Sequence, residues 1–236
     1  MGKRIAMVLF LVLAVTGLAQ AQEPKFLQLS VFDPIQLVPK EESIKGISLD
    51  LFYVVNKDVT GFSLSFLGVN RVTGNEQGVQ WGLANWDEGY TYGWSAGLLN
   101  YTADRFVGFQ DGWVNVTEGD VTGVQWGLVN WTEGYVHGWQ NGAFNYTVGR
   151  FVGLQSGLFN MSKGETSGVN LGFVNYSKGS FKGFQWGVVN YAESMDGFQL
   201  GFVNYTKNLK GLQIGLANYN GNKEPLEFMV IANWSF

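Results

Sequence analysis

The stretch that decides the fold is Gly78-Val79-Gln80-Trp81-Gly82-Leu83-Ala84-Asn85-Trp86. Its pattern is glycine, apolar, glutamine, any residue, glycine, two apolar residues, asparagine and aromatic, and it returns throughout the chain. At a spacing of 15 residues, further copies begin at Gly93, Gly108, Gly123, Gly138, Gly153, Gly168 and Gly183. Two more copies follow at a spacing of 14, and degenerate copies begin near Gly46 and Gly61. A fixed period predicts one repeated structural unit rather than a fold organised around an active site.

Within each unit, the residues alternate with a period of two. Residues 106–116, Phe-Val-Gly-Phe-Gln-Asp-Gly-Trp-Val-Asn-Val, show this alternation, and no stretch has the 3.6-residue spacing of an amphipathic helix. Triplets that end in glycine, such as Thr132-Glu133-Gly134 and Ser162-Lys163-Gly164, separate the units. Because glycine accepts the backbone angles of tight turns, these triplets predict turns between strands. The sequence therefore predicts an all-β protein.

The first arrangement that this repeat suggests is an antiparallel β-meander. With two-residue loops, an odd period of 15 keeps each unit position on one face of the sheet, and small residues pair with large ones. The meander would have about 14 strands, and an even number suits a closed up-and-down barrel without exposed edges. The ending Phe228-Met229-Val230-Ile231-Ala232-Asn233-Trp234-Ser235-Phe236 resembles the C-terminal strand of outer-membrane barrel proteins. A closed antiparallel barrel is therefore the first expectation.

The alternative arrangement is a β-solenoid, in which each 15-residue unit forms one coil. Two observations favour it over a membrane barrel. Asp111 and Asn141 would lie at mid-depth on the lipid side of a barrel, where polar residues are costly, and both barrel ends would carry similarly short turns. In a solenoid, identical residues stack in columns, so the asparagines and the glutamines would form side-chain ladders.

The N-terminal 21 residues have the pattern of a secretory signal peptide. Lys3 and Arg4 precede an apolar run over residues 5–18, which Ala19-Gln20-Ala21 follows. We expect residues 22–236 to be the mature chain and to form a single all-β repeat domain. With 13 basic and 19 acidic residues, that chain has a net charge of about −6, and without a basic patch it should not bind nucleic acid. Because the chain has no cysteine, no disulfide framework can stabilise it.

Two units carry a resemblance to a known family. They are Gly197-Phe198-Gln199-Leu200-Gly201-Phe202-Val203-Asn204 and Gly211-Leu212-Gln213-Ile214-Gly215-Leu216-Ala217-Asn218. These units resemble those of the leptospiral-type surface-repeat proteins of two-membrane bacteria. The resemblance extends over nearly the whole mature chain, including the lead-in at residues 27–39. It implies export to the outer membrane or the cell surface, and it brings no catalytic residue.

Two sets of residues are candidates for a role beyond general packing. The first set, which we expect to be structural, contains the repeat residues Gly78, Gln80, Gly82, Asn85, Gly123, Gln125, Gly127, Asn130, Gly183, Gln185, Gly187 and Asn190. The second set holds aromatic residues at the ninth unit position: Trp86, Tyr101, Trp131, Tyr146, Tyr176 and Tyr191. This row would be an interfacial girdle in a membrane barrel. In a solenoid it could stack against sugar rings, although packing between strands is the simplest interpretation.

The sequence offers no set of catalytic or metal-binding residues. The only histidine, His137, occupies a unit position that Val107 and Thr122 hold elsewhere. The sequence therefore lacks the residues that a zinc site or a Ser/His/Asp triad requires. Glu88, Glu118 and Glu133 are expected to be solvated turn residues. We expect no enzyme, no cofactor and no metal. Two functions stay open: a structural or pore-like outer-membrane role, and a secreted solenoid with an adhesive or glycan-binding face for a glycan or protein partner.

Overall fold

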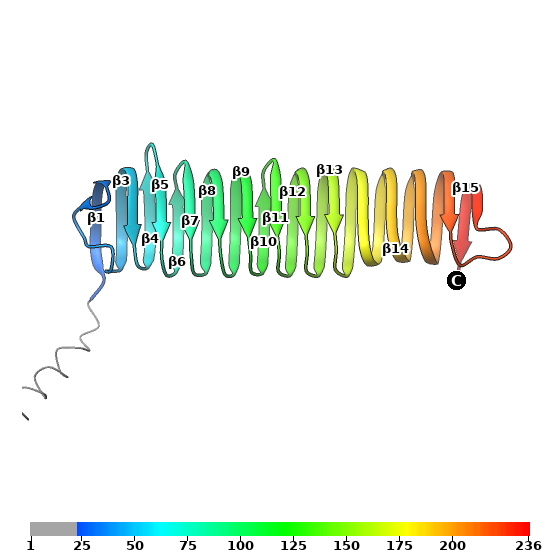
Figure 1. Ribbon diagram of the computed structural model, residues 1–236, viewed down its shortest axis with the longest axis horizontal. Helices are drawn as coiled ribbons and strands as arrows, with labels where there is room; N and C mark the ends of the chain where they lie inside the picture. The colour runs from blue at the N-terminus through cyan, green and yellow to red at the C-terminus, as the bar shows by residue number, and fades with distance from the viewer. Residues whose placement is uncertain (1–22) are drawn as a thin grey trace, which may run out of the picture.

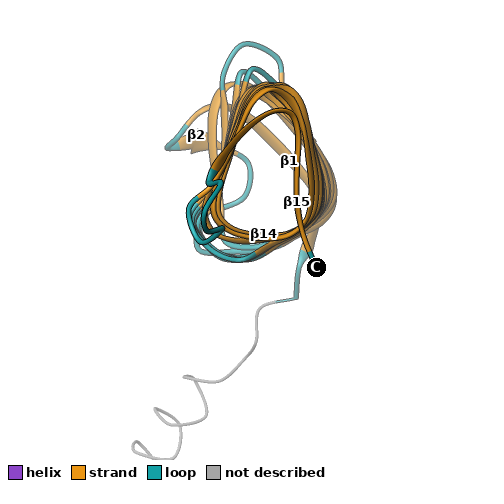
Figure 2. Cartoon of the chain, turned by 90° about the vertical axis from the view of Figure 1, so that its right-hand side faces the viewer, coloured by secondary structure: helices purple, strands orange, loops and turns teal. Residues whose placement is uncertain are grey.

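The computed structural model describes residues 23–236. The predicted signal peptide, residues 1–21, lies outside the described residues. Over the described residues the chain winds into an elongated β-solenoid, with its coils stacked side by side from one end to the other (Figure 1). Viewed along the long axis, the coils superimpose as one oval ring (Figure 2).

Neighbouring coils pair as parallel strands in a single sheet. The strands are β1 (Lys25–Phe32), β2 (Ile35–Gln36), β3 (Ile44–Asn56), β4 (Val59–Ser65), β5 (Val69–Val72), β6 (Glu76–Trp81), β7 (Ala84–Asp87), β8 (Thr91–Thr102), β9 (Phe106–Thr117), β10 (Val121–Trp126), β11 (Val129–Thr132), β12 (Val136–Thr147), β13 (Phe151–Ser162), β14 (Thr166–Asn220) and β15 (Phe228–Ser235). Paired residues are one repeat period apart in the sequence, since Gly93 lies beside Gly108 and Asn100 lies beside Asn115. The long strand β14 continues through several coils without a break.

The expected antiparallel meander and its closed barrel are wrong. In the coil that begins at Gly123, the chain bends at residues 127–128 and turns at residues 133–135, so one unit returns to its starting side. A unit is thus a full coil instead of one strand, and the next unit lies parallel to it. Within the described residues, antiparallel pairs occur at the two ends, between β1 and β2 and between β14 and β15. The predicted glycine-ended triplets do form turns, but these turns connect coils rather than hairpins.

Each coil directs four of its unit positions into the interior. In the coil from Gly123 these are Gln125, Asn130, Thr132 and Val136, all fully buried. Their neighbours in sequence point outward because side chains alternate along a strand. The interior therefore consists of stacked columns, of which three are mostly polar and one is mostly apolar.

Buried apolar residues, most of them from the apolar column, form three clusters along the rod. They contain Val38, Ile44, Val59 and Val72, then Phe106, Val121, Val136 and Phe151, and then Phe181, Ala192, Met195 and Leu209. Between the first two clusters, the same column holds Glu76 and Thr91. Hydrophobic burial thus stabilises separate segments of the rod, and polar ladders link them.

Candidate binding surface

The asparagines of the repeat form a continuous hydrogen-bonded ladder. Asn130 Nδ2 donates to Asn145 Oδ1 at 2.8 Å and to the backbone oxygen of Asn141 at 2.9 Å. Equivalent side-chain bonds join every coil from Asn70 to Asn218. The candidates Asn85, Asn130 and Asn190 are therefore fully buried members of this ladder. A buried amide is costly without partners, and here each coil supplies the partner of the next.

The glutamines form a second ladder in two runs. Gln125 Nε2 donates to Gln110 Oε1 at 2.8 Å, and the bonds continue to Gln155. A second run begins at Gln185 and continues to Gln213. Between the runs stands Asn170, whose side-chain oxygen and nitrogen have no partner, because its side chain is one methylene shorter. These glutamines fill the interior, so the neutral channel that a pore-like role requires is not formed.

The repeat glycines allow this close stacking of coils. At Gly123 the backbone has a φ of +132°, and an added Cβ would overlap the carbonyl oxygen of Gly108. At Gly127 an added Cβ would overlap the carbonyl oxygen of Gly112 and lie 2.9 Å from Asn115 Nδ2. Gly78, Gly183 and Gly187 have the same surroundings, whereas an added Cβ at Gly82 would lie 3.1 Å from the carbonyl oxygen of Gly68. Of the twelve residues of the first candidate set, the glutamines and asparagines are thus buried in the interior, and the glycines lie against the neighbouring coil.

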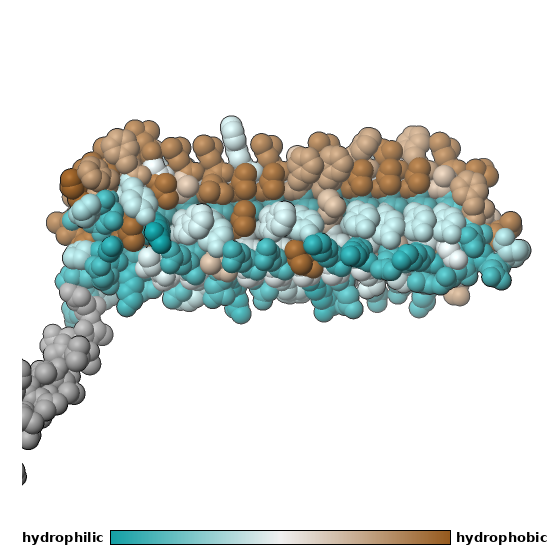
Figure 3. Space-filling view, in the orientation of Figure 1, coloured by the Kyte–Doolittle hydropathy of each residue, from teal (hydrophilic) through white to brown (hydrophobic). Residues whose placement is uncertain are grey.

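The aromatic row of the ninth unit position lies on the outside and stacks in groups along the rod, which Val116 and Met161 separate. Ring centroids are 4.1 Å apart for Trp86 and Tyr101, 4.4 Å for Trp131 and Tyr146, and 4.6 Å for Tyr176 and Tyr191. The planes of the Tyr176 and Tyr191 rings differ by 12°, so their faces cover each other. In Figure 3 the row forms a pale band along the rod. Stacking leaves mainly ring edges and hydroxyl groups for outside contacts.

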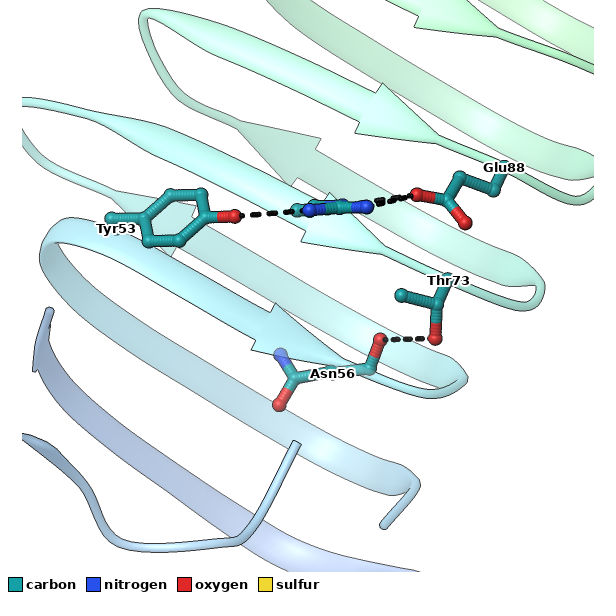
Figure 4. A network of polar contacts seen from close by, with 5 residues as sticks. Tyr53, Asn56, Thr73 and Glu88 are labelled. Carbon is teal, nitrogen blue, oxygen red and sulfur yellow. Dashed lines mark hydrogen bonds and ion pairs between the residues drawn. The ribbon is translucent and has the colours of Figure 1, made fainter. Parts of the chain in front are cut away.

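At the N-terminal end of this row, an arginine takes the place of an aromatic residue. Arg71 pairs in register with Trp86. Its guanidinium donates to Glu88 Oε1 at 2.6 and 3.0 Å and reaches the hydroxyl of Tyr53 at 3.5 Å (Figure 4). Nearby, Thr73 Oγ1 donates to the backbone oxygen of Asn56 at 3.4 Å (Figure 4). Because more than a third of each side chain of the ion pair is exposed to solvent, the pair contributes little to stability.

The largest surface feature is an apolar edge, made of the side chains at unit positions four and six. The exposed large members are Trp81, Leu83, Leu98, Trp113, Trp126, Leu128, Leu158, Phe173, Trp186, Phe202, Ile214 and Leu216. In Figure 3 a brown band of apolar side chains with some paler ones runs along the upper edge of the rod, and polar side chains lie on the lower side of the view. Sequence reasoning named no residue of this edge as a site, although the recurring apolar residues around the second glycine were its signal. Those residues would have been the lipid-facing side of the expected barrel.

Over the last coils, the apolar edge is hollowed into a groove of about 880 Å³. One wall contains Leu171, Trp186, Leu200 and Ile214 of unit position four. The other wall contains Leu158, Phe173, Val188, Phe202 and Leu216 of unit position six. Gly172, Gly187, Gly201 and Gly215 form the floor. The groove exists because the fifth residue of the unit has no side chain.

A pair of carboxyl groups lies in the interior, where sequence reasoning expected none. Glu76 and Asp87 are both 1 % exposed. Burial raises the pKa of Asp87 to about 7, while hydrogen bonds from Thr91 and Gln80 oppose that shift. Burial also raises the pKa of Glu76 well above its usual value, and the charge of Asp87 adds to the effect. Since neither group reaches the surface, the pair cannot exchange protons with a substrate.

The remaining sequence candidates lie apart on the surface. His137 is exposed on β12, and Glu88, Glu118 and Glu133 are exposed in turns between coils. Tyr101 donates from its hydroxyl to Glu118 Oε1 at 2.8 Å. Within residues 23–236, no three His, Cys, Asp or Glu side chains lie close enough to hold a metal ion.

Comparisons with protein-family models, with curated proteins and with solved structures give no match. Among the described residues, no helix has the length and apolar character needed to cross a membrane.

Proposed function

We propose that this chain is an exported, non-catalytic solenoid of the cell envelope that adheres to a partner surface through its apolar edge. The observation that carries this proposal is the edge itself, a line of exposed leucine, phenylalanine and tryptophan along the rod. Monomeric soluble proteins rarely expose a contiguous apolar surface of this size unless it has a partner. The signal-peptide pattern and the resemblance to surface-repeat proteins support the envelope location.

Adhesion has more support than glycan recognition. A sugar ring stacks on the free face of an aromatic ring, whereas the rings of the aromatic row cover one another at centroid distances of 4.1 to 5.2 Å. The apolar edge beside the row also offers few hydrogen-bonding groups for hydroxyls. An enzymatic role has no support, because the buried carboxyl groups cannot reach a substrate.

Cell fractionation of the full-length tagged protein tests this function. The edge variant carries Leu83→Glu, Leu98→Glu and Leu128→Glu, all on exposed side chains. The control variant carries Thr122→Glu, His137→Glu and Ser167→Glu, which add a similar charge on another side of the coil. We expect the wild type and the control in the envelope fraction, and the folded edge variant in the soluble exported fraction.

Two results would contradict the proposal. Wild-type protein in the cytoplasm would show that the chain is not exported. Retention of the edge variant in the envelope, at the level of the control, would show that the apolar edge is not the adhesive surface.

A further inference from the structure

The groove on the apolar edge is closed at its C-terminal end. Strand β15 covers the last coil, and Ile231 pairs with Gly215 in the antiparallel register. Ile231 therefore takes the place where one more coil would put a glycine. Its side chain, 76 % exposed, rises from the floor and lines the groove.

At the other end of the groove, the wall becomes polar. The residues of unit position four in the two preceding coils are Asn141 and Ser156, which lie in register with Leu171. Ser156 Oγ donates to Asn141 Oδ1 at 2.6 Å, and Trp139 Nε1 donates to Ser156 Oγ at 3.0 Å. One continuous column thus changes from hydrogen-bonding to apolar residues in the direction of Ile231.

This gradient matches an amphiphilic ligand. We propose that the groove binds one acyl chain of a monoacyl lipid, with the tail toward Ile231 and an uncharged or zwitterionic head group beside Asn141 and Ser156. The proposal rests on the proposed function, because it gives the adhesive edge a ligand.

The length of the groove fits an acyl chain. The groove extends over five coils, from the coil of Leu158 to the coil of Leu216. Adjacent strands lie about 4.8 Å apart, so the four steps between these coils make the groove about 19 Å long. One leaflet of a bilayer holds its acyl chains in about 15 Å, half of the hydrocarbon thickness. An extended chain of ordinary membrane-lipid length therefore fits between the polar end and Ile231.

The chemistry of the walls disfavours other occupants. The side chains that line the groove are all apolar or the ring of Trp186. A bound peptide would bury backbone N–H and C=O groups without partners, which is costly. A sugar would lose the hydrogen bonds of its hydroxyls in the same way. An alkyl chain has no such groups to satisfy.

Calorimetry with the purified mature protein tests the proposal. The probe is palmitoyl-lysophosphatidylcholine below its critical micelle concentration, compared with the eight-carbon analogue. We expect one palmitoyl lipid per chain and at least tenfold weaker binding of the short analogue, because each buried methylene contributes to affinity. The lipid should also change the tryptophan fluorescence of the wild type, and this change should shrink in Trp186→Phe.

A matched pair of variants locates the site. Leu216→Glu places a charge in the groove wall, whereas Leu98→Glu makes the same change at the same unit position in the N-terminal half. Both side chains are exposed, so both variants should keep the circular dichroism and melting curve of the wild type. We expect at least tenfold weaker lipid binding for Leu216→Glu and unchanged binding for Leu98→Glu.

Several results would overturn the lipid site while leaving the adhesive edge intact. They are an absence of lysolipid binding, equal losses in both variants, or binding to phosphatidylcholine vesicles alone. A wild-type dimer that Leu216→Glu converts to monomer would also overturn it, since a second copy would then cover the groove. Envelope retention of the Leu83, Leu98 and Leu128 variant is measured separately and tests the adhesive edge.

Discussion

At the scale of single residues, stability depends on buried amides that hydrogen-bond from coil to coil. Each ladder asparagine both accepts and donates, so its removal affects two neighbouring coils. Buried polar columns of this kind are tolerated because every group inside the column has a partner. The exceptions include the side chain of Asn170, several oxygen atoms in the region of Glu76 and Asp87, and the side-chain oxygen atoms of Gln155 and Gln213 at the ends of the two glutamine runs, none of which has a partner.

The first prediction concerns the asparagine ladder. Asn130→Ala removes the acceptor of Asn115 and both donor bonds of Asn130. We expect a loss of about 3 kcal/mol in the free energy of unfolding, since a buried donor is left without a partner. Urea denaturation measures the change, with the exposed Thr122→Ala as the control. A loss below about 0.5 kcal/mol would contradict a stabilising role of the ladder.

The second prediction concerns the pH dependence caused by Asp87. The pKa of this carboxyl is about 7 in the folded chain, whereas its ordinary value, which applies to the unfolded chain, is 3.8. The folded state therefore binds the proton more tightly. Asp87 therefore lowers stability progressively as the pH rises from about 4 to about 7. Asp87→Thr recreates the pair that Thr132 and Gln125 form at 3.0 Å in a later coil.

We expect Asp87→Thr to raise the free energy of unfolding at pH 8 by an amount on the order of 2 kcal/mol. The gain should shrink toward pH 4, near the ordinary pKa of 3.8, where the unfolded state also begins to bind the proton. Urea denaturation at several pH values measures it, and Asp104→Asn, at an exposed turn position, is the control. An Asp87→Thr protein that is less stable than wild type at pH 8 would refute this account.

At the scale of the structural element, glycine determines the shape of the coil. The first glycine of the unit adopts a backbone angle that other residues avoid, and the fifth leaves room for the asparagine amide. Because the coils are in register, one glycine column meets the backbone of the next coil along the whole rod. The same absence of a side chain creates the floor of the groove.

The third prediction tests this requirement. In Gly123→Ala the new Cβ would overlap the Gly108 carbonyl oxygen at a φ of +132°. In Gly221→Ala the nearest atoms are 3.4 Å away. We expect Gly123→Ala to cost several kcal/mol, roughly 3 or more, and Gly221→Ala to change stability by less than about 0.5 kcal/mol. Thermal unfolding followed by circular dichroism compares them, and equal melting temperatures would contradict the prediction.

At the scale of the whole molecule, the rod is a one-dimensional array whose ends need protection. Stacked coils present unpaired strand edges at each end, and such edges pair with other chains. Here β1 and β2 cover the N-terminal end, and β15 pairs antiparallel with the last coil of β14. The antiparallel direction of β15 stops the repeating register.

The fourth prediction follows from this cap. Removal of residues 222–236 would expose the edge of the last coil, from Gly211 to Asn220. We expect the shortened chain to self-associate, whereas the chain of residues 22–236 should elute as a smaller species at the same concentration. Size-exclusion chromatography with light scattering measures the mass. Identical monomeric masses would show that β15 is not needed to protect the edge.

Both candidate sets could be read from the sequence, but their surroundings could not. The pattern around Asn130 predicted a ladder if the units stacked, and the aromatic row was visible as a column. The apolar edge was missed because Leu83 and Leu128 were assigned to the lipid side of a barrel. Glu76 and Asp87 gave no signal, since, although Asp87 aligns with Thr102 by the period, only the stacked coils show that this unit position is buried.

The sequence by itself determined that the protein is all-β and that its unit has 15 residues. Those properties follow from local alternation and from the period, both of which one chain segment contains. Only the tertiary structure decided that the strands run parallel in coils and that the glutamines fill the interior. Alternation with a period of two is the same in a meander and in a coil, so the direction of pairing depends on contacts between residues 15 positions apart.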